Sequence, residues 1–258
     1  MQVGTDIELI ATDAQGVPRS VIDKIPGTKI DPHATDHGHI QVDNVLPEFN
    51  IPPASSAVEF RDNINNVLSD LYHYLSPHGL EVKAMSSAFF PDEELQHPDA
   101  QEAGCDPDYD IYILDINTKP NLSNTRLRSA GGHVHVSWHG AENLTELVSM
   151  VKAMDLFLGV PSILLDPDTN RRSLYGKAGA CRQKTYAEGV YGVEYRSLSN
   201  FWASSNTLME WVFNNTQEAL TRKNNFDWDK MDHIPSIINN NLTDDANRLV
   251  TELGVPMP

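Results

Sequence analysis

The short stretch GGHVHV, residues 131–136, is typical of a β-strand that carries polar side chains on one face. Side chains two positions apart on a strand share a face, so His133 and His135 point one way and the valines the other. The two preceding glycines let the backbone approach a ligand closely. A lone strand histidine is more often a core residue, whereas this doublet after two glycines favours a ligand.

Two other stretches have the same spacing. DIE, near the start, places Asp6 and Glu8 on one strand face, and VEYR does the same for Glu194 and Arg196. Carboxylates and an imidazole on one sheet face indicate a divalent metal site, and an arginine among them indicates a bound phosphate. The alternatives are an acid-protected edge strand for the first pair and a simple salt bridge for the second.

A third acidic pair, Asp43 and Glu48, lies in the stretch DNVLPEFN. The surroundings are apolar, so an unpaired carboxylate here would be costly. Capping and turn chemistry explains Asn44 and Asn50 but explains Glu48 less well.

The charge balance limits the kind of partner. The chain has 258 residues and a formal net charge of −17, which argues against nucleic acid because phosphate neutralisation needs a basic surface. Basic residues are instead concentrated locally, which fits a small anionic ligand better than a long polyanion. These residues are Arg126, Arg128, Arg171, Arg172, Lys177, Arg182 and Lys184.

Cysteine usage and hydropathy bear on the compartment. The two cysteines, Cys105 and Cys181, are far apart, so neither a disulfide framework nor a zinc knuckle is indicated. The sequence predicts no membrane span, and Met1 leads straight into a strand-like segment without the features of a secretory signal. We therefore expect a protein of the reducing cytoplasm.

The hydrophobic pattern predicts an α+β fold with a largely antiparallel sheet, because strands and helices alternate irregularly and some connections have hairpin length. No linker marks a boundary, so we expect a single domain, 1–258. The predicted strands cover 2–12, 39–50 (a pair), 82–89, 110–117, 127–138 and the VEYR segment. The predicted helices cover 58–75, 142–158, 208–220 and 244–253, and 171–192 is predicted as a basic loop.

Taken in order, several motifs resemble the phage phiEco32-like COOH–NH2 ligase type 2 family, part of the glutamine synthetase and glutamate–cysteine ligase superfamily. The resemblance runs from about Gly4 to about Trp202 and implies a curved, mainly antiparallel sheet. Its concave face would hold ATP and divalent metals, with helices on the convex face. The motifs are DxE, DNVLPEFNIPPAS, CDPDYD, LRSAGGHVHVSW, LYGKAGACR and GVEYRSLSNFW.

The resemblance also implies roles for residues. Arg196 matches an arginine that contacts the transferred phosphate, and Arg182 matches a basic position near the phosphates or the acyl substrate. Lys29 could reach the site, without a specific role. The implied ligands of Mg²⁺ or Mn²⁺ are Asp6, Glu8, Asp43, Glu48, His133 and Glu194, and further phosphate-binding candidates are Arg171, Arg172 and Lys177.

The implied activity is an ATP-dependent carbon–nitrogen ligase. A carboxylate is a poor electrophile, so ATP would convert it to an acyl phosphate, and an amine would then displace phosphate to form an amide or peptide bond. The substrates would be small-molecule or peptide carboxylates and amines. A guanidino-kinase-like phosphotransferase, a hydrolase and a non-catalytic phage protein that retains the fold stay open. A homo-oligomer also stays open, and a phage-encoded chain would work in the host cytoplasm.

Overall fold

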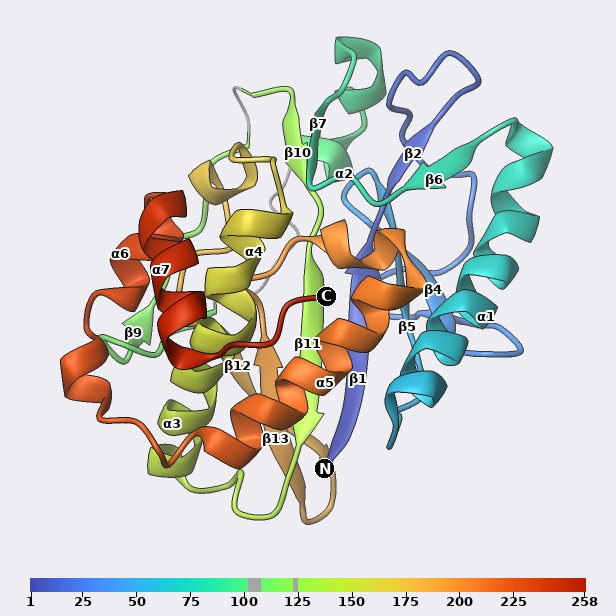
Figure 1. Cartoon of the computed structure of the whole chain (residues 1–258). Helices are drawn as coiled ribbons and strands as arrows, with labels where there is room; N and C mark the ends of the chain where they lie inside the picture. The colour runs from blue at the N-terminus through green and yellow to red at the C-terminus, as the bar shows by residue number, and fades with distance from the viewer. Residues whose placement is uncertain (102–107, 123–124) are drawn as a thin grey trace.

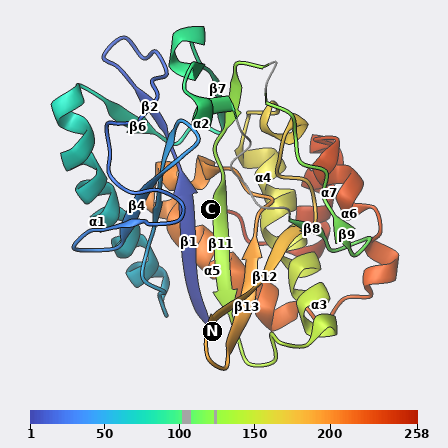
Figure 2. The ribbon, with the colours of Figure 1, turned by 180° about the vertical axis from the view of Figure 1, so that it is seen from behind.

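The computed structural model describes residues 1–101, 108–122 and 125–258. Its main feature is a twisted sheet with helices packed against one face (Figures 1 and 2). In the described part of the chain this sheet has nine strands in the order β3-β4-β5-β1-β11-β13-β12-β8-β9. Every ladder between named strands is antiparallel. The predicted α+β fold with a mainly antiparallel sheet is therefore confirmed.

The strands of the large sheet are β1 (Gln2–Glu8), β3 (His33–Ala34), β4 (His39–Asp43), β5 (Leu46–Asn50), β8 (Tyr109–Asp110), β9 (Asp115–Ile116), β11 (Gly132–Ser137), β12 (Ala180–Ala187) and β13 (Val190–Tyr195). Two small sheets pair β2 (Ile10–Thr12) with β6 (Glu81–Lys83) and β7 (Ser87–Phe89) with β10 (Leu127–Ser129). The α-helices are α1 (Ala57–Leu75), α2 (Pro98–Gln101), α3 (Leu144–Met154), α4 (Val160–Leu165), α5 (Asn206–Arg222), α6 (Ile234–Asn239) and α7 (Thr243–Leu253).

Alternation along the central strands separates the two faces of the sheet. On β11, Val134 and Val136 are fully buried in the core, as are Val193 and Tyr195 on β13. The alternate residues of these strands, which include both histidines and Glu194, point to the opposite face. The helices in Figure 1 cover the apolar face, and Figure 2 gives the view from the side of the polar face.

The helices cover the apolar face with aromatic and aliphatic side chains. Ser56 caps α1 by accepting a hydrogen bond from Glu59 N, which explains why that predicted helix begins where it does. Phe60 of α1 packs between Trp202 and Phe213, with ring centroids 5.9 and 6.0 Å apart. These contacts join the N-terminal and C-terminal helices behind the strands that carry the polar face.

Several boundaries differ from the prediction. Residues 110–117 form the β8–β9 hairpin rather than one strand, because Leu114 takes a positive φ of 55° in the connecting turn. The predicted basic loop over 171–192 is wrong for its second half, which forms β12 and the start of β13. Residues 127–138 divide into β10 and β11, which belong to different sheets.

The predicted helix over 142–158 is in fact a longer helical run. It starts at α3, continues as a π-helical turn at Asp155–Gly159 and ends with α4. The run Leu144–Leu165 is long and apolar enough to cross a membrane by length and composition, but 78% of its most apolar window is buried inside the fold. Its hydropathy is therefore accounted for by core packing.

The π-helical turn places one carboxylate, Asp155, in the core behind β13. Asp155 is fully buried and accepts hydrogen bonds from Tyr195 Oη (2.7 Å), Gly179 N (2.7 Å) and Ser197 Oγ (3.3 Å). Burial raises the pKa of Asp155 to about 7, despite these donors. The folded protein therefore binds this proton more tightly than the unfolded chain does.

We expect the Asp155 carboxyl to lower the free energy of unfolding by a few kcal/mol as the pH rises from about 4 to about 7. Below this window both states are protonated, and above it the buried carboxylate is ionised. Asp155→Asn should flatten the dependence, measured as the free energy of unfolding in urea at several pH values. Asp36→Asn, at an exposed site, is the control. An unchanged slope in Asp155→Asn would contradict the assignment.

Candidate active site

Strand register brings the predicted acidic residues and histidines together on the polar face. In the ladder of β1 with β11, Asp6 lies opposite His133, and β1 pairs Glu8 with Glu48 of β5. On the other side of β11, His135 lies opposite Glu194. Residues far apart in the chain thus form one continuous polar strip across four strands.

One group of carboxylates consists of Glu8, Asp43 and Glu48, all buried. Each offers an oxygen within 4.8 Å of the others. Burial and the neighbouring Asp6, Asp43 and Glu8 hold the pKa of Glu48 well above its usual value. Burial and Asp43 likewise raise the pKa of Glu8. Mutual repulsion in a desolvated site therefore disfavours full ionisation of this group, and a bound cation would relieve it.

Polar neighbours hold the carboxylates of this first group in place. Gly131 N donates to Glu8 Oε2 at 2.6 Å, and Gln41 Nε2 donates to Glu48 Oε2 at 2.6 Å. Lys29 Nζ lies 3.2 Å from Asp43 Oδ2, so the lysine does reach the candidate site. Oxygen donors of this kind suit Mg²⁺ or Mn²⁺.

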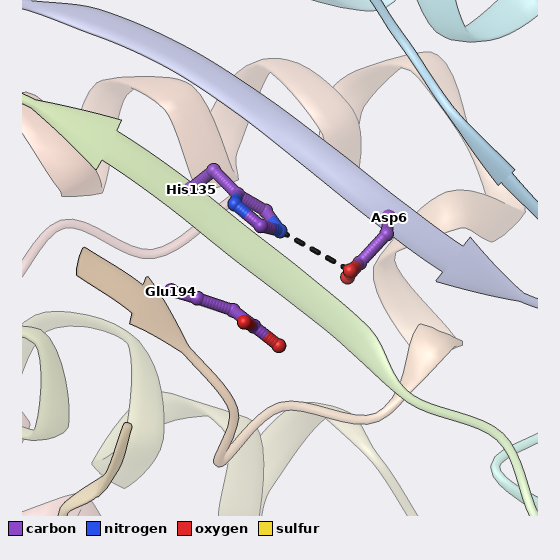
Figure 3. A group of neighbouring side chains, drawn as sticks. All are labelled: Asp6, His135 and Glu194. Atoms are coloured by element: carbon purple, nitrogen blue, oxygen red, sulfur yellow. Dashed lines mark ion pairs between the residues drawn. The ribbon is translucent and has the colours of Figure 1, made fainter. Parts of the chain in front are cut away.

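A second group consists of Asp6, His135 and Glu194, contributed by β1, β11 and β13 (Figure 3). His135 Nε2 lies 3.2 Å from Asp6 Oδ2. His133 reaches the same carboxylates, since its Nδ1 lies 2.8 Å from Asp6 Oδ1 and 3.8 Å from Glu194 Oε1. Burial alone would raise the pKa of Asp6, but the two imidazoles outweigh it and hold this pKa well below its usual value.

Glu194 is the carboxylate around which basic side chains gather. It forms ion pairs with Arg196, with Arg182 Nη1 at 3.2 Å and with Lys184 Nζ at 3.3 Å. Burial and Asp6 raise its pKa, whereas Arg196 and the two histidines lower it more, to about 2. Glu194 is thus an ionised carboxylate with arginines beside it, a combination with the charges that suit a cation and phosphate oxygens.

The three remaining basic candidates lie at different distances from this strip. The Arg171 guanidinium is buried and donates to Ser197 O (3.2 Å) and Arg196 O (3.3 Å), so it braces the segment that carries Arg196. Arg172 Nη2 donates to Ser162 Oγ at 3.0 Å. Lys177 is exposed and lines a separate hollow. Of the three, Arg171 alone shares a cavity with Arg196 and His133.

Two cavities flank the polar strip. A hollow of about 500 Å³ is lined by Asp6, Glu48, His135 and Lys184 and by apolar side chains that include Ile51 and Pro53. A smaller cavity of about 40 Å³ is lined by Glu8, Asp43 and His133, together with Arg128, Arg171 and Arg196. The first is large enough for a drug-sized ligand, and the second is small and basic on one wall.

Gly131 and Gly132 make room for neighbouring protein groups. A Cβ added to Gly131 would lie 2.4 Å from His133 Nε2, and one added to Gly132 would lie 2.6 Å from Trp202 Nε1. The glycines therefore allow His133 to fold back along β11 and Trp202 to pack beneath it.

Sequence reasoning did not assign roles to His135, Lys184, Tyr186 or Gln41, which all line the larger hollow. His135 could have been found from alternation, since it lies two residues from His133 on a predicted strand. Lys184 could not, because its strand, β12, has a sequence that predicts a loop. Gln41 carries no such signal, because its partner Glu48 is set by the register of β4 with β5. Cys105 and the first half of the CDPDYD motif lie outside the described residues.

Comparison with protein families supports the predicted resemblance. Residues 125–233 match the family model described as phage phiEco32-like COOH.NH2 ligase-type 2. The resemblance to this carboxylate–amine ligase family is thus confirmed over this segment, which holds both histidines, Arg182, Glu194 and Arg196. The match starts after the N-terminal motifs and ends beyond Trp202, so its limits differ from the predicted ones. No curated protein matches the sequence.

Solved structures show the fold at low sequence identity. A bifunctional glutathione synthetase from Pasteurella multocida has a TM-score of 0.50 and 13% identity, over 99% of this chain and 45% of that chain. Plasmodium falciparum glutamine synthetase has a TM-score of 0.45 and 10% identity, over 86% of this chain and 52% of that chain. GmaS without ligand has a TM-score of 0.44 and 12% identity, over 86% of this chain and 54% of that chain. The chain spans about half the length of these proteins. The first similarity shows a shared fold alone, and the other two are too low to bear on it.

We expect Glu48→Gln to raise the metal-free free energy of unfolding by about 1 kcal/mol, because it removes a charge that the neighbouring carboxylates repel. The same variant should lose most of the thermal stabilisation by Mg²⁺ or Mn²⁺. Urea denaturation without metal measures the first effect, and differential scanning fluorimetry with and without metal measures the second. Exposed Glu252→Gln is the control. If metal raised the melting temperature of Glu48→Gln as much as that of the unaltered protein, this would count against a cation at this group.

Proposed function

We propose that this protein is an ATP- and divalent-metal-dependent ligase that joins a carboxylate to an amine through an acyl phosphate. The observation that carries the proposal is the pairing of two metal-competent groups with Arg196 and Arg182 on one sheet face. The family match over 125–233 supports the same reaction class. We further propose that 1–258 is one catalytic domain that works in the cytoplasm, in the host cell if the chain is phage-encoded.

The residues of both groups fit divalent cations, since carboxylate oxygens and imidazole nitrogens are suitable donors. In the first group the pKa of Glu48 stays raised although Lys29 reaches Asp43. Glu8, Asp43 and Glu48 would hold one ion, and Asp6 and Glu194 with a histidine would hold another. When bound, such ions neutralise phosphate oxygens during phosphoryl transfer.

The arginines supply fixed positive charge beside these groups. Arg196 Nε donates to Asp108 Oδ2 at 3.1 Å, and its other end pairs with Glu194, so the guanidinium is held from two sides. Arg182 is held by Glu194 from the neighbouring strand. We assign to Arg196 and Arg182 the stabilisation of charge on the transferred phosphoryl group, which needs no side-chain reorganisation when the charge is already positioned.

The two cavities divide the substrates. We assign ATP to the hollow of about 500 Å³, whose wall combines apolar residues with Lys184 and His135. We assign the reacting carboxylate to the small cavity, where Arg171 and Arg196 provide positive charge. Arg171 Nε is buried without a hydrogen-bond partner among the described residues, so this wall retains a donor for an anion.

The decisive assay incubates the purified protein with ATP, Mg²⁺ and pooled amino acids or peptidoglycan fragments. We expect ADP release that depends on the amine, with mass spectrometry showing an amide product. A stable phosphorylated product without an amide would instead indicate the phosphotransferase, and ADP release without an amine would indicate hydrolysis. Failure to bind nucleotide at millimolar ATP would overturn the proposal.

Glu194→Gln should reduce kcat/KM by about 100-fold or more and abolish the thermal shift with Mg²⁺–ATP, because the amide lacks the charge that holds the cation and Arg196. Glu188→Gln, an exposed residue in the turn of the same hairpin, is the matched control. A Glu194→Gln protein with an unchanged Mg²⁺–ATP shift would favour a non-catalytic protein that retains the fold.

A further inference from the structure

Tyr186 projects from the β12–β13 hairpin toward the larger hollow. The ladder between the strands is irregular at this point, since Thr185 pairs with Tyr191 but Ala187 pairs with Val190. The Tyr186 ring lies over Gly192, where an added Cβ would come within 2.8 Å of a ring carbon. A glycine at this position thus lets the tyrosine cross β13 and reach β11.

The Tyr186 hydroxyl makes two contacts that together fix a proton on His135. It donates to Val193 O at 3.2 Å and lies 2.9 Å from His135 Nδ1. A phenol has one hydrogen, so a hydroxyl that donates to the carbonyl must accept from Nδ1–H. A neutral His135 then carries its lone pair on Nε2.

The lone pair on Nε2 points at another acceptor. Nε2 lies 3.2 Å from Asp6 Oδ2, the pair that the dashed line marks in Figure 3, and Glu194 offers an oxygen within 4.8 Å of both. Two acceptors at this separation repel unless a proton or a metal cation lies between them. A divalent cation bound by all three residues satisfies them together.

His133 is placed differently. Its Nδ1 lies 2.8 Å from Asp6 Oδ1, so in a neutral His133 this nitrogen donates to the carboxylate, and Arg196 Nη1 lies 3.3 Å from the same nitrogen. His135 faces the tyrosine on one side and carboxylates on the other. Of the two histidines, His135 therefore has its free lone pair directed at both carboxylates of the second group.

We propose that Tyr186 is a positioning residue that fixes His135 in the tautomer that presents Nε2 to a divalent cation shared with Asp6 and Glu194. This inference rests on the proposed function, because it concerns one of the metal sites that the reaction requires. It adds His135 to the ligands predicted from sequence and gives Tyr186 a role that acts through the imidazole.

The test uses the full chain and Mn²⁺ alone, with bound ion counted by electron paramagnetic resonance of the free ion. Tyr186→Phe keeps the ring and removes the hydroxyl, so the His135 proton can move to Nε2. We expect Mn²⁺ binding at the second group to weaken by about 10-fold or more. Tyr191→Phe removes a hydroxyl from the neighbouring strand, and its Mn²⁺ affinity should match that of the unaltered protein.

A double-mutant cycle separates positioning from a general structural effect. If Tyr186 acts through His135, the Tyr186→Phe/His135→Ala protein should bind Mn²⁺ as weakly as His135→Ala alone. Additive losses, or a Tyr186→Phe affinity equal to that of the unaltered protein, would overturn the inference and leave the proposed function standing. An unaltered protein that binds no Mn²⁺ would overturn both.

Discussion

The structure depends on a sheet register that forces like charges together. The pairing of β1 with β5 sets Glu8 opposite Glu48, and Asp43 joins them from β4. Such a cluster is unfavourable in a desolvated site, so it persists only because the packing behind it overdetermines the register. A slip of one residue would turn Ile7 and Phe49, both buried in the core, toward solvent. The energy that holds the carboxylates together therefore comes from the opposite, apolar face of the same strands.

The two halves of the polar strip meet this constraint in different ways. Around Glu194, the protein supplies its own cations, and the carboxylate is ionised with a pKa of about 2. Around Glu48, the pKa is held well above its usual value by burial and by other carboxylates, with Lys29 reaching Asp43 from a loop. The first half is already compensated and suits the binding of an anion beside a cation. The carboxylates around Glu48 would be stabilised by additional positive charge, and a divalent ion supplies this charge without a further side chain.

Strand alternation allowed much of this site to be predicted from sequence. The spacings of Asp6 with Glu8, His133 with His135, and Glu194 with Arg196 gave the correct shared faces, because period-two alternation is a local property. The hairpin strand β12 was missed because ACRQKTYA has charged and polar residues on both faces and reads as a loop. The hydrogen-bond partners of the histidines could not be predicted from the sequence either. They depend on the strand register and on Tyr186, which crosses from β12 over Gly192.

The family match and the strand pairing concern different residues of the candidate site, so they support it independently. The match covers 125–233, which contains both histidines, Arg182, Glu194 and Arg196, but none of the N-terminal carboxylates. The fold nevertheless places Asp6 opposite His133 and within reach of His135, and brings Glu8 beside Gly131. The histidines and Glu194, which lie in the segment matched by the family model, and the N-terminal carboxylates, which strand pairing places beside them, thus form one set of candidate metal ligands. An acidic edge strand that served solubility alone would have no reason to meet that segment in register.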